Sequence, residues 1–326
     1  MISLCEGGYV ETLEHLIFAV KGLSHPKDRC IAYLRYIPDP NGERTRKDGL
    51  KFRRMYDLRE SEEYLRRNFP KYLYFDERRG MLLQAVPHTT IQRVYQPTKG
   101  LAEMRQDPVN ELEQSAVNLA ETISKEAKIP LNNIGISGSL LLGLAIASSD
   151  IDLIFYDEEN CRKAYEVLKE LRQKSLISPY DDKRAMRVTT ERWSETELNF
   201  NELVEIEKRK LLHGLFGQRG YFIRLVKGCE TEEASYKPLG TFVLRARVRD
   251  SRDSIFTPCR YLVDCLEESD QDAVEEFVSH RGKFTEQACK GDLVEAQGKL
   301  EKVLAEGRNY LRLLLGDAGD YLIPVG

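Results

Sequence analysis

Long hydrophobic runs are missing from this chain of 326 residues, and no stretch approaches the roughly 18 apolar residues that a membrane-spanning helix needs. The first residues carry Glu where a secretory signal places Lys or Arg ahead of its apolar core. The seven cysteines are an odd number, widely scattered and without a Cys-x-x-Cys pair, so neither a disulfide framework nor a zinc knuckle is indicated. We therefore expect a cytoplasmic protein with no membrane partner.

A strong excess of one charge is also missing. The chain has 49 Lys and Arg against 53 Asp and Glu, which excludes a wholly basic, histone-like nucleic-acid binder but allows local basic patches. Basic side chains concentrate in residues 44–54, where six of eleven residues are Lys or Arg. We interpret this run as a mobile basic loop that is either solvated or binds a polyanion, with Arg53 and Arg54 as candidate nucleic-acid contacts.

The composition changes twice along the chain, which predicts an α+β protein in three parts. Residues 1–107 are rich in strand-forming residues and turn punctuation, and residues 229–326 return to strands with one short acidic helix near residues 272–278. Between them, residues 108–228 combine helical periodicity with short apolar strands. The hydrophobic fraction of 41% is sufficient for several cores. We predict a central mixed sheet with helices, flanked by a basic β-rich N-terminal domain and a β-rich C-terminal domain.

The central part is predicted to alternate helices and strands. Apolar residues recur at spacings of three and four in residues 109–127, so a helix is expected to begin at Pro108, with Asp107 as its cap. The further elements expected in chain order are strands at residues 134–136 and 151–156, helices at 159–174 and 197–212, and a strand at 221–226.

One motif in the central part indicates chemistry. Gly138-Ser139 opens a turn, and Asp150-Ile-Asp152 follows ten residues later at the start of an apolar strand. Because strand residues two apart point to the same face, the carboxylates of Asp150 and Asp152 are predicted to lie together. Like charges this close repel, and a divalent cation such as Mg²⁺ makes the pair favourable. Gly138 lets backbone N–H groups approach a phosphate, and the hydroxyl of Ser139 can donate a further hydrogen bond.

Gly138-Ser139, the ten-residue spacer and the acid-hydrophobic-acid-hydrophobic pattern from Asp150 resemble the signature of the DNA polymerase beta-like nucleotidyltransferase superfamily. The resemblance covers about 120 of the 326 residues. Within the superfamily, the narrower group that the chain most resembles is that of archaeal predicted nucleotidyltransferases of unassigned role. It implies a nucleotidyltransferase palm at residues 108–228, in which Asp150 and Asp152 are catalytic and bind Mg²⁺ or Mn²⁺. Gly138, Ser139 and Ser149 are the implied nucleotide-binding residues. The implied reaction transfers a nucleotidyl group from an NTP to an acceptor, with RNA preferred and a protein hydroxyl second.

Active members of this superfamily usually carry a third acid on a neighbouring strand, and its identity stays open here. The candidate strand, residues 221–226, has Arg224 at its centre, and a guanidinium beside two carboxylates competes with a metal ion. Glu197, Glu205 or Glu230 could supply the oxygen from another element, or Arg224 could face away and pair elsewhere. The alternative function is therefore an inactive nucleotidyltransferase fold that serves as an RNA- or nucleotide-binding module.

A second cationic feature lies in the C-terminal part. Apolar residues alternate with Arg245, Arg247 and Arg249, which predicts a strand with three guanidiniums on one face. Such a row suits the phosphates of RNA, whereas a solvated face balanced by neighbouring acids explains it equally well. The residues leave both readings open, and they predict neither the oligomeric state nor the base that is transferred.

Overall fold

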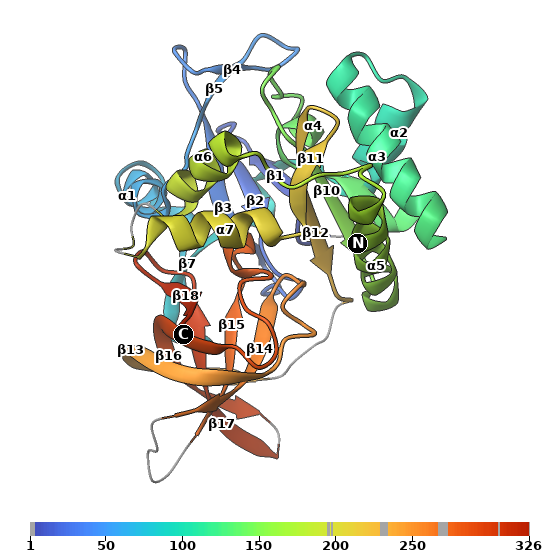
Figure 1. Ribbon diagram of the computed structural model, residues 1–326. Helices are drawn as coiled ribbons and strands as arrows, with labels where there is room; N and C mark the ends of the chain where they lie inside the picture. Colours follow the sequence, from blue (N-terminus) through green and yellow to red (C-terminus); the bar gives the residue numbers. More distant parts are fainter. Residues whose placement is uncertain are drawn as a thin grey trace. The chain divides into compact units, whose positions relative to one another are not determined.

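The structure is a computed structural model that describes residues 4–193, 196, 198–228, 234–266, 273–305 and 307–325. The chain forms two compact units. Unit 1 comprises Met1–Asp76, Met81–Val167 and Gln218–Glu230, and unit 2 comprises Glu77–Gly80, Leu168–Gly217 and Thr231–Gly326. Both units contain helices and strands, which confirms the predicted α+β class (Figure 1).

Unit 1 begins with an eight-stranded sheet. Its strands are β1 (Tyr9–Thr12), β2 (Ile17–Val20), β3 (Arg29–Pro38), β4 (Arg44–Thr45), β5 (Lys51–Arg54), β6 (Leu73–Asp76), β7 (Met81–Pro87) and β8 (Ile91–Tyr95). They run in the order β4-β5-β3-β2-β1-β8, and β7 pairs with β3 and β6. Phe18, Leu34 and Val86 meet in its buried core, together with Leu65 of helix α1 (Leu58–Asn68). The strands therefore bury an apolar face, as the composition of the N-terminal part predicts.

The basic run at residues 44–54 is a hairpin rather than the predicted loop. Arg44 pairs with Phe52 across strands β4 and β5, and Arg54 pairs with Tyr36 of β3. Phe52 is fully buried and packs with Tyr36. The expectation of a loop was wrong because the many charged residues of this segment leave little apolar pattern from which a strand can be predicted. Strand β5 is held to the sheet by the buried side chain of Phe52.

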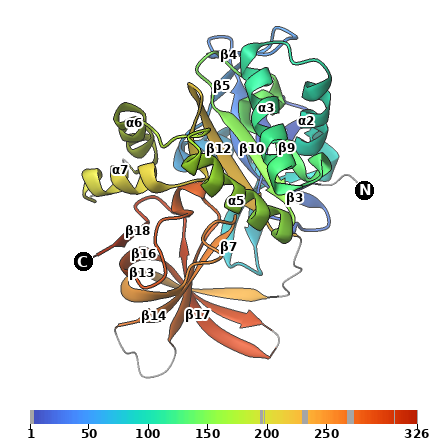
Figure 2. The ribbon, with the colours of Figure 1, turned by 45° about the vertical axis from the view of Figure 1, so that its right-hand side comes forward.

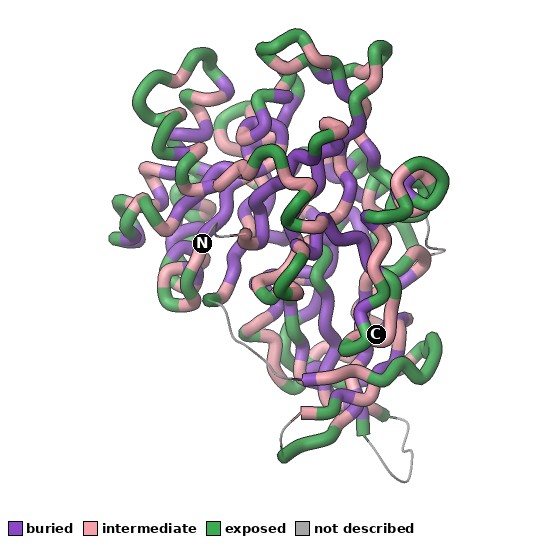
Figure 3. Tube along the Cα trace, turned by 180° about the vertical axis from the view of Figure 1, so that it is seen from behind, coloured by how far each residue is buried: buried purple, intermediate pink, exposed green. Residues whose placement is uncertain are grey.

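The second sheet of unit 1 carries the predicted motif. Its strands β12 (Arg219–Val226), β10 (Ile151–Tyr156) and β9 (Ile134–Ile136) are neighbours in that order, with β10 parallel to β12 and antiparallel to β9. The helices that accompany them are α2 (Pro97–Gln106), α3 (Glu111–Ala127), α4 (Gly138–Leu142) and α5 (Glu158–Gln173), whose last turns belong to unit 2. α2 packs on β9 and α3 packs on β10 (Figure 2). Buried residues run along all three strands (Figure 3).

Helix α3 confirms the predicted periodicity but begins later than expected. Its cap is Asn110, whose side chain accepts a hydrogen bond from the Glu113 N–H, rather than Asp107. Glu113 in turn accepts from the Val109 N–H at 3.0 Å, so two N–H groups at the helix start are satisfied by a reciprocal pair. That pair outweighs the preference of Pro108 for a first helical turn.

Unit 2 contains two helices and a sheet that closes on itself. The helices are α6 (Asp182–Trp193) and α7 (Phe200–Arg209). The strands of the sheet are β13 (Ser235–Asp250), β14 (Cys259–Cys265), β15 (Val274–Ser279), β16 (Leu293–Ala305), β17 (Arg308–Leu315) and β18 (Tyr321–Pro324), and β11 (His213–Phe216) is a strand outside this sheet. β13 pairs with both β14 and β16, so five strands join in the order β13-β14-β15-β17-β16 and back to β13. Tyr261, Phe277 and Leu313 are fully buried in its core.

Of the helices expected in this region of the chain, one is a strand and another is shorter than expected. The acidic helix near residues 272–278 is strand β15, whose Val274 and Phe277 are buried and which pairs with β14 and β17. The helix expected at residues 197–212 is the shorter α7, and α6 ahead of it was not predicted. In α6, charged residues outnumber apolar ones, so the sequence gives only a weak helical pattern for the buried stripe of Ala185, Val188 and Trp193.

No helix in the described ranges combines the length and apolar character that a membrane span requires.

Candidate functional site

The two predicted acids lie at the start of β10. Asp150 immediately precedes the strand and Asp152 is its second residue, and both are half-buried. On one side, the backbone N–H of Ser137 donates to the carbonyl oxygen of Asp152 at 2.8 Å. On the other side, Asp152 is in register with Phe222 of β12. The strand pairing therefore fixes the glycine-serine turn next to the acidic pair.

Gly138 lies directly against the carboxylate of Asp152. It has a φ of +61°, and a Cβ atom at this position would overlap the carboxylate and lie 2.8 Å from its Cγ. A side chain at residue 138 would thus be disfavoured both by the backbone conformation and by the contact. The turn and the acids, ten residues apart in the sequence, are one site in the structure.

The three serines of the motif have different environments. The hydroxyl of Ser139, in the first turn of α4, makes no hydrogen bond to any residue in the described part of the chain. The hydroxyl of Ser149 accepts hydrogen bonds from Nη1 of Arg44 at 3.1 Å and from the Ile146 N–H at 3.0 Å. Ser137 donates its hydroxyl proton to the Gly7 carbonyl at 2.7 Å. Ser139 is therefore the serine available to a ligand, whereas Ser149 holds the loop that leads to Asp150.

The charge balance around Asp152 is unusual for an aspartate. Burial, with a further contribution from the charge of Asp150, raises the pKa of Asp152 to about 6, although Arg54, Arg224 and Arg35 act in the opposite direction. The ionised pair is thus only partly neutralised by the protein. A site of this kind gains free energy by taking up a proton or a cation between its carboxylates.

Arg224 pairs with a carboxylate that lies outside the sequence motif. Its guanidinium lies 2.7 Å from Oε1 of Glu6, and Glu6 is buried and also contacts Lys21 at 2.8 Å. On β12, Arg224 is in register with Ile154 rather than with Asp152. Arg224 therefore neither replaces a third acid opposite Asp152 nor faces solvent, and it is held by a residue 218 positions away in the sequence.

The two arginines predicted as nucleic-acid contacts in the basic run separate in the structure. Arg54 is close enough to Asp152 to lower its pKa, and its guanidinium stacks over the ring of Tyr56 at 4.6 Å. Arg53 instead forms ion pairs with Glu60 at 2.8 Å and with Asp39 at 3.5 Å. Of the two, the structure brings Arg54 to the candidate site.

Among the residues that the structure describes, no third acid joins the pair in a metal-binding group. The described residues include no group of three or more His, Cys, Asp or Glu side chains that could hold a metal ion. Of the three predicted candidates, Glu205 forms an ion pair with Lys208 within α7, and Glu197 and Glu230 lie outside the described residues.

The donor set present still fits one hard cation. Mg²⁺ in phosphate-transfer sites is commonly held by one or two carboxylates, with phosphate oxygens and water completing its shell. Asp150 and Asp152 supply two carboxylates on one strand end, and Gly138 leaves the space beside Asp152 free of a side chain. The site therefore fits an Mg²⁺ ion that arrives with a phosphate group.

The predicted row of arginines lies on β13 in unit 2. Ala246 and Val248 are buried while the three arginines are exposed, as the alternation requires. Arg245 contacts Glu295 at 2.8 Å, Arg249 contacts Asp264 at 3.3 Å, and Arg247 donates to the Gly291 carbonyl at 2.9 Å. Each guanidinium thus has an acceptor within the protein, and contact with RNA stays a prediction.

Comparison with known proteins identifies one relative of the whole chain. It is the uncharacterized protein MJ1086 of Methanocaldococcus jannaschii, which is 31% identical over 324 residues, with 94% of each chain covered. No family model matches the chain, and no solved structure matches it. The chain belongs to the same family as MJ1086.

Proposed function

We propose that unit 1 is a nucleotidyltransferase of the DNA polymerase beta-like superfamily, which transfers a nucleotidyl group from an NTP with the help of Mg²⁺. The observation that supports this most directly is the contact of Gly138 with the carboxylate of Asp152. The turn that carries Gly138 and Ser139, whose hydroxyl has no hydrogen-bond partner among the described residues, then lies next to two carboxylates suited to a metal ion. Phosphoryl transfer needs those two features in one place.

Each residue of the site has a defined part in this reaction. Asp150 and Asp152 would hold Mg²⁺, which would supply Lewis-acid chemistry at the phosphate and at an attacking hydroxyl. Ser139 and the N–H groups of its turn donate hydrogen bonds to the β- and γ-phosphates. Arg54 supplies positive charge close to Asp152, where the negative charge of the triphosphate accumulates.

The chemical step is an in-line displacement at the α-phosphate. A hydroxyl oxygen of the acceptor forms a bond to the α-phosphorus while the bond from that phosphorus to the bridging oxygen breaks. The hydroxyl proton passes to a water molecule of the solvent, and pyrophosphate leaves with the electron pair of the broken bond. RNA is the acceptor that we favour, because the exposed arginines of β13 suit a polyanion; a protein hydroxyl is the second choice.

One observation favours the alternative of an inactive, nucleotide- or RNA-binding member of the superfamily. The residue of β12 in register with Asp152 is Phe222, so an apolar ring stands on the neighbouring strand where a third acid would complete the metal site. A protein of this kind would bind NTP at Gly138 and Ser139 without transferring it.

Incubation with Mg²⁺, total RNA and each α-labelled NTP in turn tests the proposal. Label is expected in RNA with the wild type, and it should be absent with Asp152→Ala. Asp28→Ala is the matched control, because Asp28 is an exposed carboxylate of unit 1 whose partner is Arg29 at 2.7 Å. Transfer of label into the protein itself would identify a protein hydroxyl as the acceptor.

The absence of label with all four nucleotides, under Mg²⁺ and under Mn²⁺, would contradict a transferase. Calorimetric titration with ATP then tests the alternative. Binding by the wild type that is weakened in Ser139→Ala would establish a nucleotide-binding module.

A further inference from the structure

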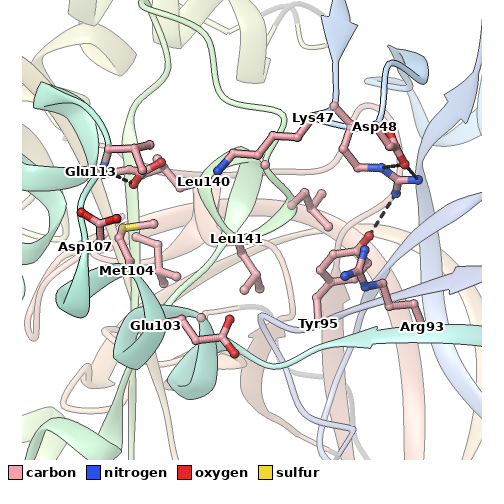
Figure 4. A pocket seen from close by; sticks show the side chains of 16 residues that line it. Lys47, Asp48, Arg93, Tyr95, Glu103, Met104, Asp107, Glu113, Leu140 and Leu141 are labelled. Atoms are coloured by element: carbon pink, nitrogen blue, oxygen red, sulfur yellow. Dashed lines mark hydrogen bonds and ion pairs between the residues drawn. The ribbon is translucent and has the colours of Figure 1, made fainter.

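Basic side chains of the β4–β5 hairpin lie in two different environments. Arg46 lines a cavity of about 440 Å³ next to α4, together with Asp48 and Tyr95 (Figure 4). It lies 2.8 Å from Glu11 and 2.7 Å from Asp48, so two carboxylates already balance its charge. Arg54, at the end of β5, forms no ion pair with any residue that the structure describes, and its buried Nε makes no hydrogen bond to them. The charge of Arg54 is therefore available to an anionic ligand.

A bulge in β3 brings a second arginine to the face of the sheet on which Arg54 lies. Two neighbouring residues of β2 are in register with Leu34 and Tyr36, so Arg35 between them is an extra residue. Leu34 and Ile37 pack in the same core although they are three apart, because the bulge interrupts the alternation of the strand. Arg35 and Tyr36 therefore point to the opposite face together, and Tyr36 is in register with Arg54 on β5.

Arg35 and Arg54, the arginine pair, have no carboxylate partner of their own among the described residues. Nη1 of Arg35 donates to the Met55 carbonyl at 3.3 Å, and neither arginine forms an ion pair in the part of the chain that the structure describes. Burial and then the charge of Arg54 lower the pKa of Arg35, and the charges of both arginines also reach Asp152. Two half-buried guanidiniums repel each other, and the oxygens of a phosphate group can accept hydrogen bonds from both. The pair is therefore suited to a phosphate next to Asp152.

An exposed aromatic ring lies next to the arginine pair. Tyr56 follows β5 and is 64% exposed, and the guanidinium of Arg54 lies over its ring at 4.6 Å from the centroid. Tyr36, by contrast, is buried in the core. Proteins that bind single-stranded nucleic acids combine such parts, because bases stack on aromatic rings and arginines contact the phosphates. Tyr56 and the arginine pair can therefore hold one nucleotide by its base and by its phosphate.

We propose that Arg35, Arg54 and Tyr56 bind the terminal nucleotide of a single-stranded acceptor RNA, with its phosphate on the arginine pair and its base on the ring of Tyr56. The chemistry of these residues decides the class of acceptor. A protein hydroxyl brings no phosphate to the arginines, and a base within a duplex is stacked on its neighbours and leaves no face for Tyr56. This role in the reaction rests on the proposed function, in which a nucleotide held next to Asp152 has its terminal hydroxyl near the acidic pair.

Binding of a short, 5′-labelled oligouridine to the full-length protein, followed by fluorescence anisotropy in EDTA and without NTP, tests the arginine pair. The double variant Arg35→Gln/Arg54→Gln should weaken binding roughly tenfold or more and lower the slope of log affinity against log salt by about 1, because a phosphate contact is lost. Arg53→Gln is the matched control, since Arg53 is the neighbouring arginine of β5 but pairs with Glu60 at 2.8 Å. Unchanged RNA affinity in the double variant would overturn the proposal.

Substitutions of Tyr56 test the base contact. Tyr56→Phe should keep the RNA affinity, because stacking needs the ring and not the hydroxyl, whereas Tyr56→Leu should lower it roughly tenfold or more. Tyr56 is exposed, so neither change should alter the stability of the fold, which urea denaturation checks. An oligouridine whose 3′-terminal base is missing should bind equally to the wild type and to Tyr56→Leu. A loss of affinity in Tyr56→Leu that persists on this strand would contradict stacking of the terminal base.

Competition by ATP and the transfer assay separate this subsite from the proposed function. ATP in EDTA should leave the oligouridine bound, and its displacement by ATP would assign the arginine pair to the NTP and overturn the proposal. RNA binding that depends on Arg35, Arg54 and Tyr56 in a protein that transfers no label would support the subsite and contradict the transferase. Transfer of label with a KM for RNA that is unchanged in the double variant would support the transferase and refute the subsite.

Discussion

Replacing Gly138 by Ala tests the geometry on which the proposed function depends. Gly138 has a φ of +61°, and a Cβ atom there would overlap the Asp152 carboxylate. A left-handed backbone conformation costs Ala about 1 kcal/mol more than Gly. Displacement of the Asp152 side chain from its rotamer costs about 1 kcal/mol more. We therefore expect Gly138→Ala to lower the free energy of unfolding by about 2 kcal/mol and to move a metal-binding carboxylate.

Gly217 provides the matched control for this substitution. Its φ is +58°, and a Cβ atom there would have no neighbour within 4 Å. Gly217→Ala thus carries the same backbone cost of about 1 kcal/mol without a displaced side chain. The change in the entropy of the unfolded chain is the same at both positions and cancels in the comparison.

Urea denaturation and Mn²⁺ binding followed by electron paramagnetic resonance measure the two effects. Gly138→Ala should be the less stable variant and should bind Mn²⁺ at least about tenfold more weakly than the wild type, because one of two carboxylate ligands moves. The double variant Gly138→Ala/Asp152→Ala should recover the stability lost to the collision, as expected for residues in direct contact. Equal stability of the Gly138 and Gly217 variants, with wild-type Mn²⁺ affinity in both, would refute the reasoning.

Three further predictions concern the buried groups of both units. Burial and the charge of Asp150 raise the pKa of Asp152 from 3.8 to about 6, so the fold loses stability as the pH rises between these two values, and the full loss is reached above about pH 6. Asp152→Asn should therefore raise the free energy of unfolding by about 3 kcal/mol at pH 7.5 and hardly change it at pH 4, and an equal effect at both values would contradict this. Burial lowers the pKa of His213 to about 4, so the unfolded chain binds the extra proton and the fold should lose about 3 kcal/mol as the pH falls from about 6.5 to 4. That part of the pH dependence in urea denaturation should be missing in His213→Gln, and its persistence would exclude His213 as the cause. Phe277→Ala, at a fully buried position, should lower the free energy of unfolding by about 4 kcal/mol in the same assay, and a loss below about 1 kcal/mol would contradict its place in the core.

Local patterns predicted much of the secondary structure. The strand expected at residues 151–156 is β10, and the helix expected at residues 159–174 is α5 within one residue at each end. Both have an apolar pattern whose period is dictated by backbone geometry, so no distant contact is needed to define them. The division of the chain at residues 107 and 228 stays a prediction.

Elements whose local pattern was weak depended on their neighbours. Val274–Ser279 carries two glutamates that favour a helix, but pairing with β14 and β17 makes it a strand. In residues 44–54, six cations obscured a hairpin that the buried ring of Phe52 holds to the sheet. In both segments, burial of one or two apolar side chains against distant strands outweighed the local preference.

The sequence by itself determined the type and spacing of the motif, because Gly138, Ser139, Asp150 and Asp152 lie within fifteen residues and carry their chemistry in their side chains. Only the tertiary structure decided that Arg54 lies near Asp152 and that Arg224 pairs with Glu6 across 218 positions. Charges on separate strands become neighbours only when the strands pack, and burial of the site, which no local pattern encodes, then sets the pKa of Asp152.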